Sequence, residues 1–317
     1  MAPRRFELRP LPPEGSALSP ELWGQECGVH ITTGRGSLED GWGGHPFHDK
    51  IESMKRTVSA HIECDIDAPA NLVFSIAVAA GFIAETETVE YEFNGHPLTP
   101  VDITDVHGTR LHEFDTGRGH LSLNYWAEVE GTAAAAPVSK NDLITYLRPS
   151  RYCESDTLLP TARSEFSGLE GRMLLDSVSS WVGEKLSYVP GSSLPTDGAV
   201  RTLLSRQGVC RDYAHLVVAL LRALDVPARL VSVYAPGLDP MDFHAVAEAY
   251  VNDEWFVVDA TALAPRQSLV RIATGRDAAD TAFLSNHGGW LALTALEVTA
   301  TVDALPRDDT RELVQLH

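Results

Sequence analysis

The chain has 317 residues, of which 44% are hydrophobic and 22% are charged, and this size and composition favour a globular protein of two domains. Its formal net charge of -19 would repel phosphate backbones and anionic lipid, which argues against nucleic acids and membrane surfaces as partners. No run approaches the roughly 18 uninterrupted apolar residues that a membrane span needs. No secretory signal is visible either, so a cytoplasmic location is expected.

The cysteines give no sign of a disulfide framework or a metal site. The four of them, Cys27, Cys64, Cys153 and Cys210, are few and dispersed, and no CxxC pair or Cys/His spacing is typical of structural zinc. We therefore expect reduced thiols and neither a metal nor an organic cofactor.

Residues 1–53 form the first segment, which contains eight glycines and six prolines. This composition predicts disorder or an extension that is absent from the native protein. Met54 is then a candidate initiator, a hypothesis that N-terminal sequencing of protein from the native host would test.

Residues 54–150 have the pattern of a β-rich domain. Runs rich in β-branched and aromatic residues at 57–66, 72–78, 88–93 and 121–129 predict strands. Turn signals such as Asn94-Gly95 separate them, so we expect a small antiparallel β-sandwich-like or barrel domain. We place its boundary near 148–160, where Pro149 and Pro160 interrupt regular structure.

Residues 151–317 change to a helical period. Apolar spacing predicts a helix over 173–186, a short helix over 199–204 and a strongly apolar helix over 210–224. Three β-rich segments follow, at 228–234, 244–251 and 255–259. Asn252-Asp253 predicts a turn that joins the last two as a hairpin.

Cys210 is a candidate nucleophile because it stands at the start of the predicted helix over 210–224. The unsatisfied N–H groups and the positive dipole end of a helix favour a thiolate, and the same amides would face an oxyanion on an attacked carbonyl. The alternative is a small buried core thiol.

His244 and Asp259 supply the context for that cysteine. His244 begins a strand 34 residues after Cys210, and Asp259 ends the partner strand of the same hairpin. The carboxylate is therefore expected to accept the Nδ1–H of the imidazole and to hold its tautomer. Each residue alone also fits an ordinary strand end or turn.

Four segments together resemble the transglutaminase-like superfamily of papain-fold cysteine enzymes. They are Gly208-Val209-Cys210-Arg211-Asp212-Tyr213-Ala214-His215-Leu216, Val226-Pro227-Ala228-Arg229, Asp242-Phe243-His244-Ala245-Val246-Ala247-Glu248 and Trp255-Phe256-Val257-Val258-Asp259-Ala260-Thr261. The similarity extends over about 56–300, where residues 271–280 resemble the tail of bacterial members and the β-rich N-terminal part resembles their accessory domain. Many relatives have Trp two residues after the histidine, where this chain has Val246.

The resemblance implies an α+β fold, with a papain-like transglutaminase core (151–317) preceded by a small β-sandwich-like domain (54–150). It implies that Cys210 is the nucleophile, His244 its base and Asp259 the orienting acid. Asp212 and Tyr213 match the family pattern and could support the site from the nucleophile helix, with helix capping and core packing as the alternatives. His215 lies about 140° from Cys210 around that helix and is not expected to be the base.

The expected chemistry is amide acyl transfer through a thioester, with a peptide or protein as substrate. Hydrolysis is the favoured outcome, and transfer of a glutamine acyl group to an amine is the alternative. Two rival interpretations are a non-catalytic module that binds peptides and a zinc site formed by cysteine, histidine and aspartate. The sequence leaves the oligomeric state open.

Overall fold

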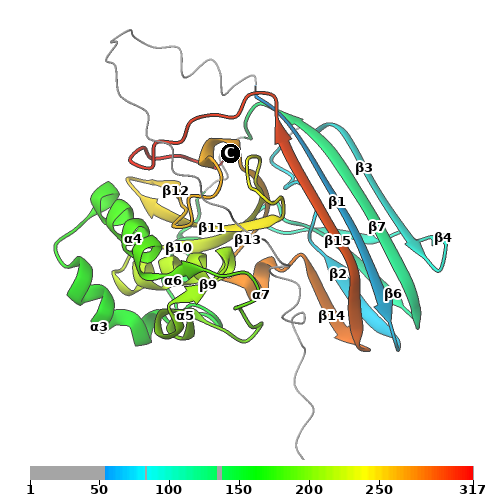
Figure 1. Cartoon of the computed structure of the whole chain (residues 1–317), viewed down its shortest axis with the longest axis horizontal. Helices are drawn as coiled ribbons and strands as arrows, with labels where there is room; N and C mark the ends of the chain where they lie inside the picture. Colours follow the sequence, from blue (N-terminus) through cyan, green and yellow to red (C-terminus); the bar gives the residue numbers. More distant parts are fainter. Residues whose placement is uncertain (1–53, 83, 134–137, 317) are drawn as a thin grey trace, which may run out of the picture.

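The computed structural model describes residues 54–82, 84–133 and 138–316 (Figure 1). The predictions for residues 1–53 lie outside the described residues.

The first sheet has the strand order β15-β1-β7-β3-β4 and is antiparallel throughout. Its strands are β1 (Lys55–Ile66), β3 (Ala84–Phe93), β4 (His96–Pro97), β7 (Gly119–Glu130) and β15 (Leu291–Val302). Along β1 and β7 buried residues alternate with more exposed ones, as expected where one face of a sheet covers a core. The predicted turn at Asn94-Gly95 is present, with positive φ at both residues.

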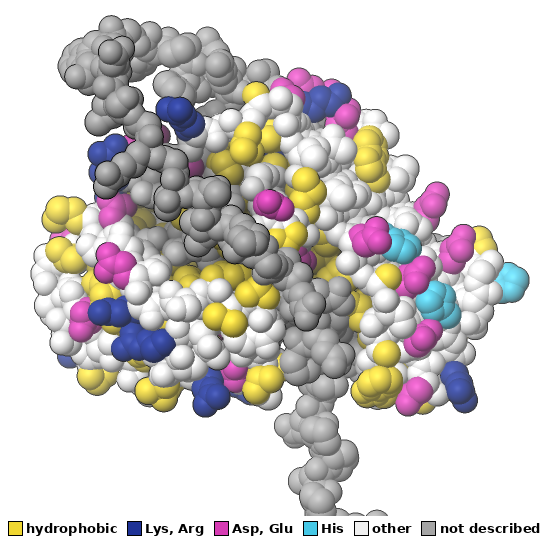
Figure 2. All heavy atoms as spheres, viewed as in Figure 1, with side chains coloured by type: hydrophobic (Ala, Val, Ile, Leu, Met, Phe, Trp, Pro, Cys, Tyr) yellow, Lys and Arg dark blue, Asp and Glu magenta, His cyan; other side chains and the backbone are white. Residues whose placement is uncertain are grey.

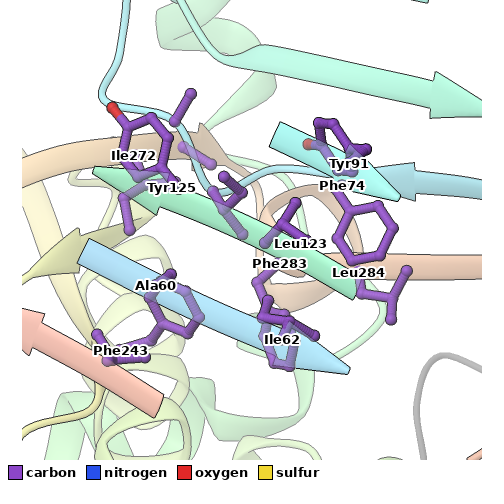
Figure 3. Close-up of a cluster of buried hydrophobic side chains, with 14 of the residues drawn as sticks. Ala60, Ile62, Phe74, Tyr91, Leu123, Tyr125, Phe243, Ile272, Phe283 and Leu284 are labelled. Atoms are coloured by element: carbon purple, nitrogen blue, oxygen red, sulfur yellow. The ribbon is translucent and has the colours of Figure 1, made fainter. Parts of the chain in front are cut away.

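A second antiparallel sheet has the order β14-β2-β6-β5. Its strands are β2 (Ala70–Phe74), β5 (Val101–Thr104), β6 (Arg110–Thr116) and β14 (Leu284–Gly288). The two sheets share one hydrophobic core, to which Ile62, Phe74, Leu123 and Leu284 contribute (Figure 3). Burial of this shared core stabilises both sheets together.

The C-terminal segment returns to these two sheets, which corrects the predicted domain limits. β14 pairs with β2 and β15 pairs with β1 along almost its whole length, so residues 284–302 complete sheets that the residues before 131 begin. The sequence had assigned everything after 150 to the catalytic domain. Pairing between strands more than 200 residues apart leaves no local signal, which is why the sequence pattern did not indicate it.

The third sheet, with the order β12-β11-β10-β13, carries the residues of chemical interest. Its strands are β10 (Ala228–Tyr234), β11 (Phe243–Val251), β12 (Glu254–Val258) and β13 (Val270–Gly275). The predicted turn joins β11 to β12, with positive φ at Asn252 and Asp253.

The helices surround α6 (Cys210–Ala223), which contacts β10 and β11 and is buried along its whole length (Figure 1). α3 (Ser155–Phe166), α4 (Gly171–Lys185) and α5 (Ala199–Ser205) pack against it. The shorter elements are α2 (Lys140–Thr145), α7 (Ala278–Thr281), the 3₁₀ helix η2 (Arg266–Ser268), β8 (Ser187–Tyr188) and β9 (Gln207–Gly208).

Two local predictions need correction. Pro160 does not interrupt regular structure but lies inside α3, where it leaves one carbonyl of the helix without its usual N–H donor. The strand predicted over 72–78 ends at Phe74, although residues 75–79 remain buried, so the apolar run reflects burial and not strand length.

A buried ion cluster ties three strands of the third sheet together. The Glu248 carboxylate on β11 accepts from Arg229 on β10 at 2.7 Å and from Arg271 on β13 at 2.6 and 3.0 Å. Burial alone would raise the pKa of Glu248, but the two guanidinium groups outweigh it and lower the pKa to about 2. Arg229 also lies over the Trp255 ring, at 4.0 Å from its centroid.

The surface agrees with the composition. In Figure 2 acidic side chains are spread over the visible face, in keeping with the formal net charge of -19. Among the described residues, no helix is both long and apolar enough to span a bilayer.

Candidate active site

Cys210 is the first residue of α6, and the chain around it is held from within the helix. The Asp212 carboxylate accepts from the backbone N–H of Val209 at 2.9 Å, which fixes the residue that precedes the cysteine. Asp212 in turn accepts from Ser193 Oγ at 2.9 Å and from Arg211 at 3.1 Å. Cys210 therefore occupies a defined place at the positive end of a 14-residue helix.

Gly208 is required by a close approach in the same turn. A Cβ atom at this position would lie 2.6 Å from the Cβ of Asp212, a distance that real Cβ atoms do not reach. The absence of a side chain at Gly208 thus allows Asp212 to fold back over the start of the helix.

His244 and Asp259 are brought together by the β11–β12 hairpin. His244 is the second residue of β11, and Asp259 directly follows β12. The Nε2 atom of His244 lies 3.0 Å from Oδ2 of Asp259, and both side chains are almost fully buried. The other carboxylate oxygen, Oδ1, accepts from the N–H of Thr261 at 2.8 Å and from its hydroxyl at 2.7 Å.

The sandwich core anchors the strand that carries His244. The neighbouring residue, Phe243, belongs to the core shared by the two sheets and stacks on Phe283 at a centroid distance of 5.2 Å (Figure 3). Because successive side chains of a strand point to opposite faces, the burial of Phe243 there turns His244 the other way.

The orientation of the imidazole corrects one prediction. Asp259 contacts Nε2, whereas the sequence argument expected Nδ1. Nδ1 is buried without a hydrogen-bond partner among the described residues, and the Cys210 side chain interacts with the same ring. The hairpin fixed the pairing of the two residues, but the rotation of the ring depends on χ2, which residue spacing does not specify.

Charge stabilisation in this pair favours an imidazolium. Burial lowers the pKa of His244, but the Asp259 carboxylate and the Cys210 side chain outweigh it and raise the pKa to about 10. For Asp259 burial acts in the opposite direction and by itself would raise the pKa of the carboxyl. The contacts with His244 and Thr261 outweigh burial, so the pKa of Asp259 lies below its ordinary value. The ring of His244 is therefore stabilised in its protonated form by the charges around it.

Asp212 and Tyr213 have the contacts of supporting residues. Asp212 caps α6 through Val209, as the capping alternative predicted. Tyr213 is buried in the helical core, and its ring lies 6.0 Å from the ring of Tyr188. His215 accepts from the N–H of Ala278 at 3.1 Å and is fully buried, so its hydrogen bond is to a different part of the chain from that of His244.

Two residues near the site were not predicted from the sequence. Tyr188, in the two-residue strand β8, pairs with Gly208, and burial together with nearby Cys210 raises the pKa of its phenol. Asp242 stands two residues before His244, and burial raises the pKa of its carboxyl to about 6. Tyr188 lies in a segment without periodicity. Asp242 does fall in the histidine motif, but its sequence position does not show its burial.

The arrangement of the described residues does not support metal coordination. No group of three or more His, Cys, Asp or Glu side chains among them is placed to hold an ion. Asp259 occupies Nε2 of His244, so the three residues of the zinc alternative do not converge on one point. A cavity of about 290 Å³ between Phe82, Trp255 and Arg271 is lined by none of the three.

Comparison with known proteins identifies the family of this chain. Residues 173–260 match the model of the transglutaminase-like superfamily. A structure from Cytophaga hutchinsonii, provisionally named a cysteine protease, superposes with a TM-score of 0.74 at 31% identity, over 80% of this chain and 92% of that chain.

Two curated relatives are uncharacterised. One from Mycobacterium leprae is 25% identical over 239 residues, which is 70% of this chain and 84% of the relative. One from Mycobacterium tuberculosis is 33% identical over 123 residues, which is 34% and 39% of the two chains. The predicted fold of mixed helices and strands with a transglutaminase-like core is confirmed, and this fold supports cysteine-dependent catalysis in general terms. The chain belongs to the transglutaminase-like superfamily.

Proposed function

We propose that this protein is an enzyme that hydrolyses an amide bond of a peptide or protein through a thioester on Cys210. The arrangement of His244 supports the proposal. Its Nε2 lies 3.0 Å from the Asp259 carboxylate, and its Nδ1 has no hydrogen-bond partner among the described residues. The Cys210 side chain interacts with the same ring. Nδ1 is therefore the ring nitrogen that can exchange a proton with the thiol.

The first half of the reaction forms the thioester. Nδ1 of His244 takes the thiol proton, and the Cys210 sulfur attacks the amide carbonyl carbon. The resulting oxyanion accepts from the backbone N–H of Cys210 at the start of α6. As the C–N bond breaks, the imidazolium returns its proton to the departing nitrogen, and the amine leaves.

The second half transfers the acyl group to water. His244 takes a proton from the water, and the hydroxide oxygen adds to the thioester carbonyl. The C–S bond then breaks as the carboxylic acid forms, and the imidazolium returns its proton to the Cys210 sulfur. The 31% identity to a protein provisionally named a cysteine protease supports water as the acceptor. Peptide substrates, a cytoplasmic location and the exclusion of nucleic acid and membrane partners remain predictions.

Two of the remaining cysteines, Cys64 and Cys153, provide an internal comparison. Burial raises the pKa of the Cys64 and Cys153 thiols to about 12, so both are held in the unreactive protonated form. We expect iodoacetamide at neutral pH to modify Cys210 before Cys64 and Cys153. Equal rates at these cysteines would contradict the nucleophile assignment.

The test of the function uses a peptide library incubated with the protein and a labelled amine, with products identified by mass spectrometry. Hydrolysis predicts shortened peptides or free acids that depend on Cys210, whereas amine-linked products would show that transamidation dominates. Cys210→Ala should abolish either product. An unchanged product yield in this variant would refute thioester chemistry, and peptide binding without turnover by the unmodified protein would favour the binding module.

A further inference from the structure

Helix α4 packs against the segment that carries Asp259. The helix contacts β12, and its buried side chains belong to the hydrophobic core that contains Val258 and against which Ala260 packs (Figure 1). The residues on either side of Asp259 are therefore seated on this helix. Ser179 and Gly183 are four residues apart, so they lie next to each other on one face of α4.

Both of these residues contact the backbone at Asp259. The Ser179 hydroxyl donates to the carbonyl oxygen of Asp259 itself, at 3.3 Å. A Cβ at Gly183 would lie 2.9 Å from the carbonyl oxygen of Ala260, which is closer than real Cβ atoms approach. Alanine is more favourable than glycine inside a helix, so the close approach of Ala260, and not the helical backbone, explains the glycine.

The peptide group that meets Gly183 also holds the carboxylate of Asp259. The carbonyl of Ala260 and the N–H of Thr261 belong to one planar peptide group, so they move together. That N–H donates to Oδ1 of Asp259 at 2.8 Å, and Oδ2 of the same carboxylate lies 3.0 Å from Nε2 of His244. A displacement of the Ala260 oxygen would therefore pass to the carboxylate and from there to the imidazole.

We propose that α4 sets the orientation of the Asp259 carboxylate through Ser179 and Gly183. The helix thereby controls how well His244 exchanges a proton with Cys210. Ser179 and Gly183 are positioning residues, since they act through Asp259. Their effect on turnover rests on the proposed thioester chemistry.

The first test is Gly183→Ala, which forces a Cβ against the Ala260 oxygen. Alanine favours a helix, so α4 itself should remain folded. With the best-cleaved peptide of the library, we expect kcat to fall roughly 10- to 100-fold while KM changes less than about twofold, because the displaced carboxylate no longer orients the imidazole. Glu184→Ala is the matched control. It introduces alanine at the next position, where the side chain is exposed, and its kcat should stay within about twofold.

The second test is Ser179→Ala, which removes the hydrogen bond to Asp259 without adding an atom. The loss of one hydrogen bond should lower kcat roughly two- to tenfold. Ser180→Ala makes the same chemical change at the neighbouring exposed position and should leave kcat unchanged.

The pH profile of Cys210 alkylation by iodoacetamide separates positioning from a purely structural role. Burial lowers the pKa of His244, but the Asp259 carboxylate and the Cys210 side chain outweigh it. A displaced carboxylate stabilises the imidazolium less, whereas Cys210 and Asp242, which also act on the ring, stay in place. In Gly183→Ala the step of the profile that depends on His244 should therefore move to lower pH by about half a unit or more.

Two sets of outcomes keep this proposal apart from the proposed function. For Gly183→Ala, a kcat within about threefold of the unmodified protein, an unchanged alkylation profile, or effects equal to those of Glu184→Ala would overturn the positioning role of α4. Alkylation needs no substrate, so its profile tests the carboxylate even without turnover. A Cys210→Ala variant that remained active would instead overturn the thioester mechanism itself.

Discussion

Asp259→Asn tests the orientation of His244 because the two oxygens of the carboxylate have different partners. Oδ1 accepts two hydrogen bonds from Thr261, and Oδ2 faces Nε2 of His244. In the variant, the amide oxygen is the group that can satisfy the two donors of Thr261. The amide NH₂ must then face Nε2 and donate to it.

This exchange would invert the imidazole tautomer. A ring that accepts at Nε2 carries its proton on Nδ1, the nitrogen needed to take the thiol proton. The carboxylate that raises the pKa of His244 to about 10 is also lost, so the imidazolium is no longer favoured. We expect kcat/KM to fall roughly 10²- to 10⁴-fold, which is about 3 to 5 kcal/mol of transition-state stabilisation.

The assay compares kcat/KM for the best-cleaved peptide and the pH profile of Cys210 alkylation in both proteins. Thr261→Val is the matched control, because it removes the hydroxyl donor but leaves the carboxylate and the backbone N–H. Its activity should fall less than about tenfold. An Asp259→Asn variant that kept a third or more of its kcat/KM, with an unchanged melting temperature, would refute the orienting role.

Three further predictions concern stability. Burial raises the pKa of Asp242 to about 6, so the Asp242 carboxyl binds its proton more tightly in the folded protein than in the unfolded chain. The fold therefore loses stability as this carboxyl ionises between about pH 4 and 6. Asp242→Asn should therefore raise the free energy of unfolding by about 1 to 3 kcal/mol at pH 8 and have no effect below pH 4. Urea titrations of both proteins would measure this, and a difference between them that did not change with pH would contradict the prediction. The pKa of Glu248 is instead lowered to about 2, so its contribution is complete above about pH 5 and is lost as pH falls toward 2. Glu248→Gln leaves two buried guanidinium groups without their carboxylate and should cost about 3 to 5 kcal/mol at pH 7, whereas an unchanged melting temperature would show that the cluster does not stabilise the fold. Gly208→Ala forces a Cβ against Asp212, so it should lower the free energy of unfolding by about 1 to 3 kcal/mol and slow the alkylation of Cys210. Gly117→Ala is the control, because a Cβ there meets nothing within 4 Å, and it should have neither effect. Equal effects of the two glycine substitutions would contradict the close approach.

The sequence predicted the local elements around the site well. The helix predicted over 210–224 corresponds to α6 (Cys210–Ala223), and the strand predicted over 228–234 matches β10 (Ala228–Tyr234). These segments are strongly apolar and end at clear signals such as Pro227, so local pattern and tertiary burial agree. The Asn252-Asp253 turn was predictable for the same reason.

What the sequence did not predict depends on contacts between distant segments. The return of β14 and β15 to the first two sheets is set by pairing across more than 200 residues. The choice of Nε2 over Nδ1 is a side-chain rotation, and a parallel pair of only two residues places Tyr188 beside Gly208. None of these features repeats with the period of a helix or strand.

The central claim is that Cys210 carries the acyl group, and intact-protein mass spectrometry tests it most directly. The best-cleaved peptide would be mixed with the protein and quenched in acid during turnover, and the adduct would be located by peptide mapping. We predict an added mass equal to the acyl fragment, on Cys210 alone and absent from Cys210→Ala. Continued turnover by Cys210→Ala, or an adduct that maps to another residue, would contradict the account.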